Sequence, residues 1–143
     1  MARPRRGSIK GPFVPHTLDL LQSASWAERT VPLMRILDRL EVEHLRHAGT
    51  RNNRLFVSYG QFVESGISRR AIAPALTLGE ELGLLKIVRP SASYGGIIRP
   101  PTAYGLTYAP DATGNTTNEW RRVTPAQAKA ARRRANAETA KSA

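Results

Sequence analysis

The fold is decided by residues 58–89, which read SYGQFVESGISRRAIAPALTLGEELGLLKIVR. Ser58 can cap a helix over residues 59–64, because Gln61 stands where a capping box needs its reciprocal partner. Gly66 then breaks this helix, since glycine readily adopts the left-handed conformation that a sharp turn requires. The stretch therefore opens with a short helix and a reversal of the chain.

A second helix is predicted directly after the reversal. Ser68 can cap this helix and Gly83 can end it. Small and apolar residues recur between them at helical spacing, so one face of the helix is expected to point into the core. The expected inward positions are Ile72, Ala75, Leu76, Gly79 and Leu82.

The segment that follows has the character of a β-hairpin. Residues 84–89 read as a strand, residues 90–103 form a loop rich in Pro, Gly and Ser, and residues 104–108 read as a returning strand. We therefore expect two antiparallel strands joined by a long tip.

Upstream, residues 30–48 carry the clearest helical pattern in the chain. Pro32 suits the first turn of a helix, and Gly49 supplies a stop. The apolar stripe of this helix is Leu33, Ile36, Leu37, Leu40 and Leu45. Two weaker elements are a short helix near residues 17–23, capped by Thr17, and a short β-type run at residues 55–57.

The resulting order is helix, helix, short strand, helix, helix, strand, long loop, strand. Over residues 17–108 it resembles the winged-helix DNA-binding superfamily, and most closely the small proteins of bacterial plasmids and phages that are similar to replication initiators. A looser likeness is to MarR-type regulators. The resemblance implies a mainly α fold with a small antiparallel β-sheet (α+β), in which the helix from Ser68 enters the major groove. It also implies that the hairpin tip between Arg89 and Arg99 reaches the DNA backbone or the minor groove.

Positive charge is concentrated at the two ends of this 143-residue chain, which has 22 Lys and Arg, 11 Asp and Glu and a net charge of +11. Residues 1–16 carry four bases and no acid, and residues 119–143 carry seven bases and two acids, whereas residues 17–118 are nearly balanced. We expect a basic flexible arm over 1–16 and the winged-helix domain over 17–108. A polar linker is expected over 109–118, followed by a basic Ala/Arg-rich segment, partly helical or disordered, over 119–143.

A charge of this size is typical of proteins that bind nucleic acids. Under the resemblance, Arg69 and Arg70 are expected to read bases, Thr77 is a candidate further along the helix, and Ser68 is expected to donate to a phosphate. The expected contacts around the preceding loop and the hairpin are Arg51, Arg54, Lys86, Arg89 and Arg99, with Tyr94 entering a groove. The basic ends are expected to add non-specific backbone contacts through Arg3, Arg5, Arg6, Arg121, Arg122, Arg132, Arg133 and Arg134.

The middle of the predicted recognition helix departs from a good sequence reader. Residues 73–75 are Ala-Pro-Ala, where long polar side chains would read bases. Pro74 lacks an amide and clashes with the preceding turn, so the helix must kink there or begin later than Ser68. If it begins near residue 73, Arg69 and Arg70 lie in the turn and clamp phosphates.

No catalytic residue, metal or cofactor is expected. Glu43, His44 and His47 share a helix, but the chain has no Cys, no second His cluster and no His-Glu-x-x-His pattern. No Gly-x-Ser-x-Gly elbow and no phosphate-binding loop are present either. These absences favour binding over catalysis.

Aromatic residues are assigned to packing. The expected core set is Phe56, Tyr59, Phe62 and Tyr104, together with Leu106. Trp26 is expected to join the first short helix to the long one, and Trp120 to dock the C-terminal segment. His16 lies in the arm with no obvious partner.

The sequence thus predicts a non-enzymatic protein that binds double-stranded DNA, in transcriptional regulation or in the replication of a plasmid, phage or other mobile element. It is expected in the cytoplasm, associated with the nucleoid, because no secretory signal or membrane span is seen. Homodimerisation stays open.

The alternative is a protein–protein adaptor whose basic tails bind an acidic partner, and the small apolar residues 73–75 favour it. RNA binding is less well supported, because spaced aromatic platforms are lacking.

Overall fold

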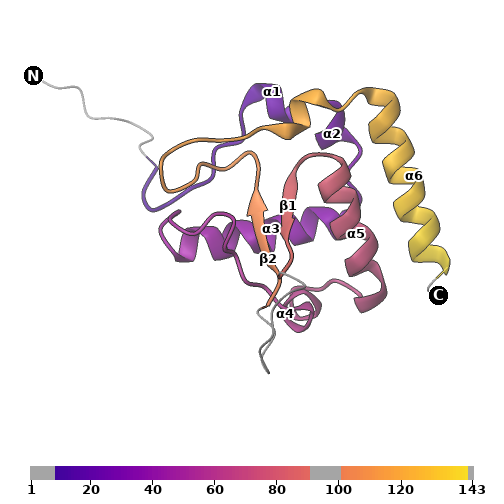
Figure 1. Ribbon diagram of the computed structural model, residues 1–143, viewed down its shortest axis with the longest axis horizontal. Helices are drawn as coiled ribbons and strands as arrows, with labels where there is room; N and C mark the ends of the chain where they lie inside the picture. Colours follow the sequence, from indigo (N-terminus) through magenta and orange to yellow (C-terminus); the bar gives the residue numbers. More distant parts are fainter. Residues whose placement is uncertain (1–8, 91–100, 142–143) are drawn as a thin grey trace, which may run out of the picture.

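Helices alternate with one small sheet in the computed structural model, which describes residues 9–90 and 101–141 (Figure 1). The helices are α1 (Leu18–Leu21), α2 (Ala24–Ala27), α3 (Val31–Arg46), α4 (Tyr59–Glu64), α5 (Arg69–Glu81) and α6 (Pro125–Lys141), with a 3₁₀ turn η1 (Glu119–Arg122) before α6. Strands β1 (Leu85–Val88) and β2 (Ala103–Leu106) pair in antiparallel fashion. The expected mainly α architecture with a small antiparallel sheet is confirmed.

Helix α3 forms the centre of the core. Four members of its predicted stripe, Leu33, Ile36, Leu37 and Leu40, are at most 1% exposed. The fifth, Leu45, is only half-buried, because the preceding residue His44 takes the inward position in the last turn. The helix ends at Arg46, because both Ala48 and Gly49 have positive φ angles and so cannot continue a right-handed helix.

The start of the chain differs from the prediction of one short helix over residues 17–23. Thr17 does cap α1, where its hydroxyl accepts a bond from the amide of Leu20 at 3.3 Å. The helix then stops, because Ser23 has extended backbone angles and caps α2 through the amide of Trp26. Two short capped helices therefore replace the single one.

The turn between α4 and α5 forms as the sequence predicts. Ser58 and Gln61 make both bonds of the capping box at the start of α4. Gly66 has a φ of +92°, and its carbonyl accepts a 2.8 Å bond from the Arg35 guanidinium of α3. The turn between α4 and α5 is thus hydrogen-bonded to the central helix α3.

Helix α5 begins at Arg69, so the alternative start near residue 73 is wrong. Pro74 lies inside the helix, where it supplies no amide to the Arg70 carbonyl. The five expected inward positions of this helix, Ile72, Ala75, Leu76, Gly79 and Leu82, are all buried.

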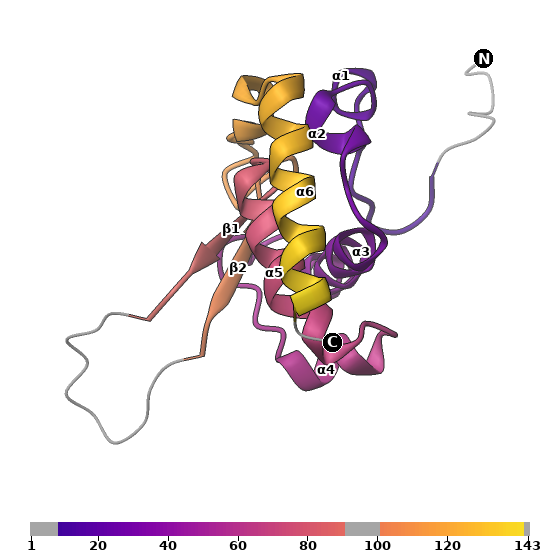
Figure 2. The same cartoon turned by 90° about the vertical axis from the view of Figure 1, so that its right-hand side faces the viewer.

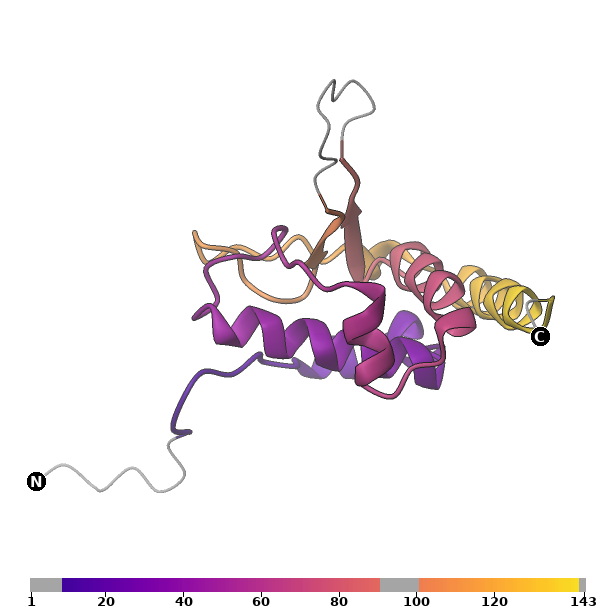
Figure 3. The same cartoon turned by 90° about the horizontal axis from the view of Figure 1, so that it is seen from below.

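The sheet is small, and its two strands stand out from the helices (Figure 3). Leu85 lies opposite Leu106 and Val88 opposite Ala103. The strand expected at residues 55–57 is reduced to one bridge, in which Leu55 exchanges both backbone bonds with Tyr104. Next to this bridge the side-chain amide of Asn52 accepts a 2.7 Å bond from the amide of Leu106 and donates to its carbonyl at 2.8 Å.

The C-terminal segment packs against the rest of the protein. Helix α6 lies along α5 and runs antiparallel to it (Figures 1 and 2). Its buried face consists of Ala128, Ala131 and Ala135, spaced by three and four residues. Trp120, only 4% exposed, joins the core as expected for a docking residue.

Gly83 explains how closely this segment approaches α5. Its φ is +70°, and a Cβ at this position would lie 2.7 Å from backbone atoms of Glu119 and Trp120. Only glycine satisfies both the left-handed turn and the contact with η1.

Two assignments to the core are wrong. Phe56 is 46% exposed and Tyr59 is 39% exposed, whereas Phe62, Tyr104 and Leu106 are buried as expected. Phe56 is exposed because the extended chain at residues 55–57 turns alternate side chains outward, whereas Tyr59 is exposed at the first position of α4.

His16 has partners that its place in the arm did not predict. Its ring meets Trp26 and Tyr108 edge-on, at centroid distances of 5.0 and 5.6 Å. Its Nε2 lies 3.1 Å from Glu41 Oε1 on α3. These contacts attach the chain before α1 to the folded body.

Candidate nucleic-acid interface

The exposed side of α5 is a narrow stripe with arginines at its beginning and an acid at its end. Arg69, Arg70, Ala73, Thr77 and Glu80 are exposed along it. Their positions follow from the burial of the opposite side of α5 against α3 and β1. Only the first turn of α5 thus offers long basic side chains.

Ser68 stands at the N-cap position of α5, but its side chain makes no capping bond. Its backbone carbonyl instead accepts the amide of Ala71 at 2.9 Å. The exposed hydroxyl is therefore not engaged in capping, and it lies beside Arg69 and Arg70.

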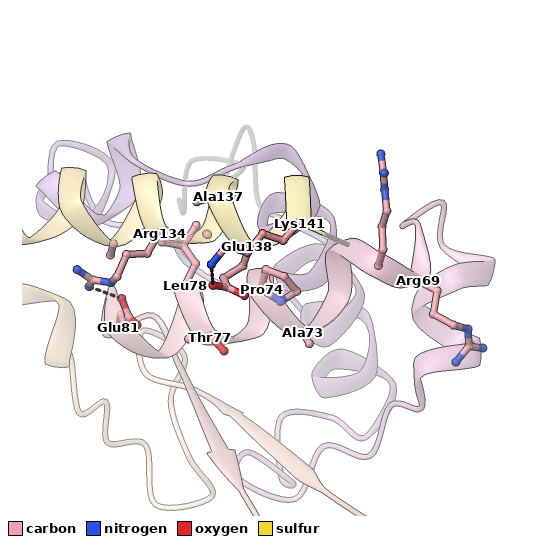
Figure 4. A pocket seen from close by; sticks show the side chains of 13 residues that line it. Arg69, Ala73, Pro74, Thr77, Leu78, Glu81, Arg134, Ala137, Glu138 and Lys141 are labelled. Atoms are coloured by element: carbon pink, nitrogen blue, oxygen red, sulfur yellow. Dashed lines mark hydrogen bonds and ion pairs between the residues drawn. The ribbon is translucent and has the colours of Figure 1, made fainter. Parts of the chain in front are cut away.

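A groove separates the exposed stripe of α5 from α6 (Figure 4). It has a volume of about 720 Å³ and an apolar floor that includes Ala73, Pro74, Leu78 and Ala135. One end is closed by an ion pair of 2.7 Å between Arg134 and Glu81. Sequence reasoning missed this groove, although the regular spacing of alanines in residues 128–135 indicates a face suited to close helix packing.

The predicted contact residues divide into two groups by ion pairing. Five of them have a carboxylate partner: Lys86 with Glu119 at 3.2 Å, Arg89 with Glu80 at 3.7 Å, Arg121 with Asp19 at 3.3 Å, Arg132 with Glu28 at 3.6 Å and Arg134 with Glu81 at 2.7 Å. These pairs link the hairpin stem and the C-terminal segment to the helices. A phosphate would have to compete with a carboxylate for each of them.

The second group is exposed and has no carboxylate within 4.0 Å in the part of the chain that the structure describes. It consists of Arg51, Arg54, Arg69, Arg70, Arg122 and Arg133. These side chains are already in solvent, so contact with an anion breaks no internal ion pair.

The strands leave the body on one side, and α4 lies at its lower end (Figure 2). Arg69 and Arg70 are the first two residues of α5, directly after the turn that follows α4. The predicted residues Arg3, Arg5, Arg6, Tyr94 and Arg99 lie outside the described residues.

Two exposed aromatic residues lie beside the hairpin stem and were not predicted as site residues. Phe56 and Tyr59 line a hollow of about 320 Å³ together with Pro101, Thr102 and Tyr104. The alternation of side chains in residues 55–57 was the available signal, since it turns Leu55 and Val57 inward and Phe56 outward.

The histidines of α3 do not assemble with acids into a metal site. Glu43 bonds Arg39 at 2.9 Å and His47 at 3.3 Å, and these partners lower the pKa of its carboxyl against the opposing effect of burial. His44 is buried on another face, and burial lowers its pKa. Within residues 9–90 and 101–141, no three His, Cys, Asp or Glu side chains are placed to hold a metal ion.

No family model, curated protein or solved structure matches the chain. Among the described helices, none combines the length and apolar character that crossing a membrane requires.

Proposed function

We propose that this protein binds double-stranded DNA without catalysing a reaction, using α4 and α5 as a helix-turn-helix and the β1–β2 hairpin as a wing. The observation that carries the proposal is that six of the predicted contact arginines are exposed and have no carboxylate partner among the described residues, in a protein of net charge +11. Such side chains neutralise phosphates and release counterions when they bind DNA.

The order of the packed elements supports this use. Helix α5 packs against α3 and α4, the exposed bond from Arg35 to Gly66 joins the turn to α3, and the bridge from Leu55 to Tyr104 joins the hairpin to the chain before α4. A helix of the length of α5 fits the major groove of B-DNA. Arg69 and Arg70, in its first turn, are the residues we assign to DNA contact in this orientation.

Helix α6 changes the role proposed for the C-terminal segment. Because it lies beside α5, it would follow the DNA backbone next to the groove that α5 enters. Two helices of about 10 Å diameter do not fit together in a major groove about 12 Å wide. We therefore assign Arg133 to phosphate contact, and we assign no base contact to α6.

The adaptor function is the second candidate, favoured by the exposed Ala73 and the apolar floor of the groove beside it. The adaptor function predicts that the chain binds an acidic protein surface. It also predicts that the affinity for duplex DNA is no higher than that of any polycation. One set of DNA titrations separates the two functions.

The test is binding of the full chain to labelled duplexes of random sequence and to genomic fragments, by fluorescence anisotropy across a salt series. Arg69→Ala and Arg70→Ala are each expected to lower the slope of log K against log salt by about one, the value for one phosphate contact. The matched control is Arg46→Ala, which removes an exposed arginine from the last turn of α3. It should leave the slope unchanged.

Two results would overturn the proposal. One is a full chain that does not bind duplex DNA at low salt. The other is an equal effect of Arg46→Ala and Arg70→Ala, which would mean that affinity follows total charge and not the face we assign.

A further inference from the structure

The groove between α5 and α6 has the size and lining of a small-molecule site. Its volume of about 720 Å³ falls within the range typical of ligand pockets, about 300–1,000 Å³. The floor is apolar and is made by Ala73, Pro74 and Leu78 from α5 with Ala131 and Ala135 from α6. Small side chains on both helices leave this space open.

The two ends of the groove differ in charge. At one end Arg134 and Glu81 form a 2.7 Å ion pair and neutralise each other. Over the floor, between Leu78 and Pro74, Lys141 Nζ lies 3.4 Å from Glu138 Oε1, so this pair is neutral as well (Figure 4). The end of the groove at the start of α5 is lined by Arg69 and Arg70, which among the described residues have no carboxylate partner.

The arginines at this end are accessible to a ligand. Arg69 extends from the start of α5 with its guanidinium group directed away from the floor (Figure 4). Neither Arg69 nor Arg70 has an ion-pair partner within the described residues. An anion at the mouth would thus gain charge-assisted bonds without displacing an internal carboxylate.

We propose that the α5–α6 groove binds an anionic amphiphile, a small molecule with an apolar body and one carboxylate-like head. The body lies on the floor between Pro74 and Ala135, and the head lies at the mouth near Arg69 and Arg70. The neutral far end gives no second anion site, so the ligand carries its charge at one end only.

Binding there has a consequence that rests on the proposed DNA-binding function. The ligand head and DNA phosphates would both use Arg69 and Arg70, so the two would compete. An amphiphile in the groove is then expected to weaken binding to duplex DNA.

The groove itself is tested without DNA, by NMR titration of the ¹⁵N-labelled full chain with octanoate and, separately, with octanol below its solubility limit. Octanoate should shift the amide signals of Ala73, Thr77 and Ala135 and should bind about tenfold tighter than octanol, the effect of one charge-assisted bond. Arg69→Gln/Arg70→Gln should bring the octanoate affinity close to that of octanol. The double substitution Arg122→Gln/Arg133→Gln, of equal charge but outside the lining, should retain the preference.

A second pair of variants tests the location. Ala137→Phe places a ring in the groove from an exposed position, so we expect weaker octanoate binding in a folded protein. Ala126→Phe makes the same change on an exposed position of α6 outside the groove and should bind octanoate as the parent protein does.

Several outcomes would overturn the proposal: no amide shifts in the groove, equal affinities for octanoate and octanol, or equal effects of the two phenylalanine variants. Groove binding of a Glu-rich peptide without octanoate binding would also overturn it and would favour a protein partner. Octanoate binding in a chain that fails to bind duplex DNA would leave the groove assignment intact and would contradict only the proposed function.

Discussion

The hydroxyl of Tyr108 donates a 2.9 Å hydrogen bond to Oε2 of Glu41, and this bond joins the chain after β2 to the central helix α3. The other oxygen of the same carboxylate meets His16, so one side chain of α3 connects three separated parts of the sequence. Burial raises the pKa of Glu41, and burial together with Glu41 raises the pKa of Tyr108 well above its usual value.

Removing this hydroxyl should destabilise the protein. Tyr108→Phe leaves a half-buried carboxylate with one partner fewer, and we expect a loss of about 1–3 kcal/mol in the free energy of unfolding. Urea denaturation measures this loss in the free energy of unfolding. The control is Tyr104→Phe: this ring is buried, and burial raises its pKa to about 12, yet its hydroxyl bonds to no group in the described chain. Equal losses in the two variants would show that the bond to Glu41 contributes nothing specific.

The buried His44 predicts an acid-sensitive stability. Its Nδ1 has no hydrogen-bond partner among the described residues, and burial lowers its pKa from the ordinary 6.5. As the pH falls below about 6.5 the unfolded chain takes up a proton that the folded protein does not, so stability is lost, by at most about 1.4 kcal/mol per pH unit.

His44→Leu should flatten this dependence when urea unfolding is measured at several values between pH 8 and pH 5. The matched control is His47→Leu, which removes the more exposed histidine of the same helix and leaves His44 in place. A His44→Leu protein with the slope of the parent would contradict the assignment of that slope to His44.

Gly83 should tolerate no side chain. Gly83→Ala forces a Cβ to within 2.7 Å of the η1 backbone in addition to a left-handed φ, and we expect a loss of about 2–4 kcal/mol. Gly114 also has a positive φ, but its Cβ would meet no atom within 4 Å. Gly114→Ala should therefore lose only about 1–2 kcal/mol, the conformational part. Thermal denaturation of both variants separates the stability lost through the contact with η1 from the stability lost through backbone strain. Equal losses in the two variants would argue against the contribution of the contact.

The docking of α6 can be tested at its alanine face. Ala128 is fully buried, so Ala128→Leu should overpack the contact and cost about 1–3 kcal/mol. Ala126→Leu, one half-turn away and exposed, should leave stability within about 0.5 kcal/mol of the parent. If both variants unfold at the parent's urea midpoint, α6 does not contribute to the folded unit in solution.

Local signals in the sequence were sufficient for the helices that form the centre of the fold. The spacing of Leu33 to Leu40 predicted α3, and the Ser58–Gln61 pair predicted the start of α4, because both patterns act within a few residues. Pro74 allowed two starts for α5. The structure selects Arg69, because the inward face from Ala71 onward is buried as one continuous helix.

Contacts between distant segments could not be predicted in the same way. Two of the partners of His16, Glu41 and Tyr108, lie 25 or more residues away in the sequence, and the docking of α6 depends on alanines, whose burial contributes little hydrophobic signal. For residues 119–143, composition alone predicted a basic segment that is partly helical or disordered, and did not predict where it packs. The groove beside α5, and therefore the candidate ligand site, exists only because that segment packs as a helix.

Asn52 has a consequence for how molecules of this protein meet one another. Its amide group presents to β2 the same donor and acceptor that a neighbouring strand would present, and it also donates to the carbonyl of Ala109 at 3.0 Å. With Leu55 bonded to Tyr104, the outer margin of β2 offers no free backbone groups at Tyr104 and Leu106. A strand from another chain finds no template there, so this side chain protects the sheet against edge-to-edge aggregation.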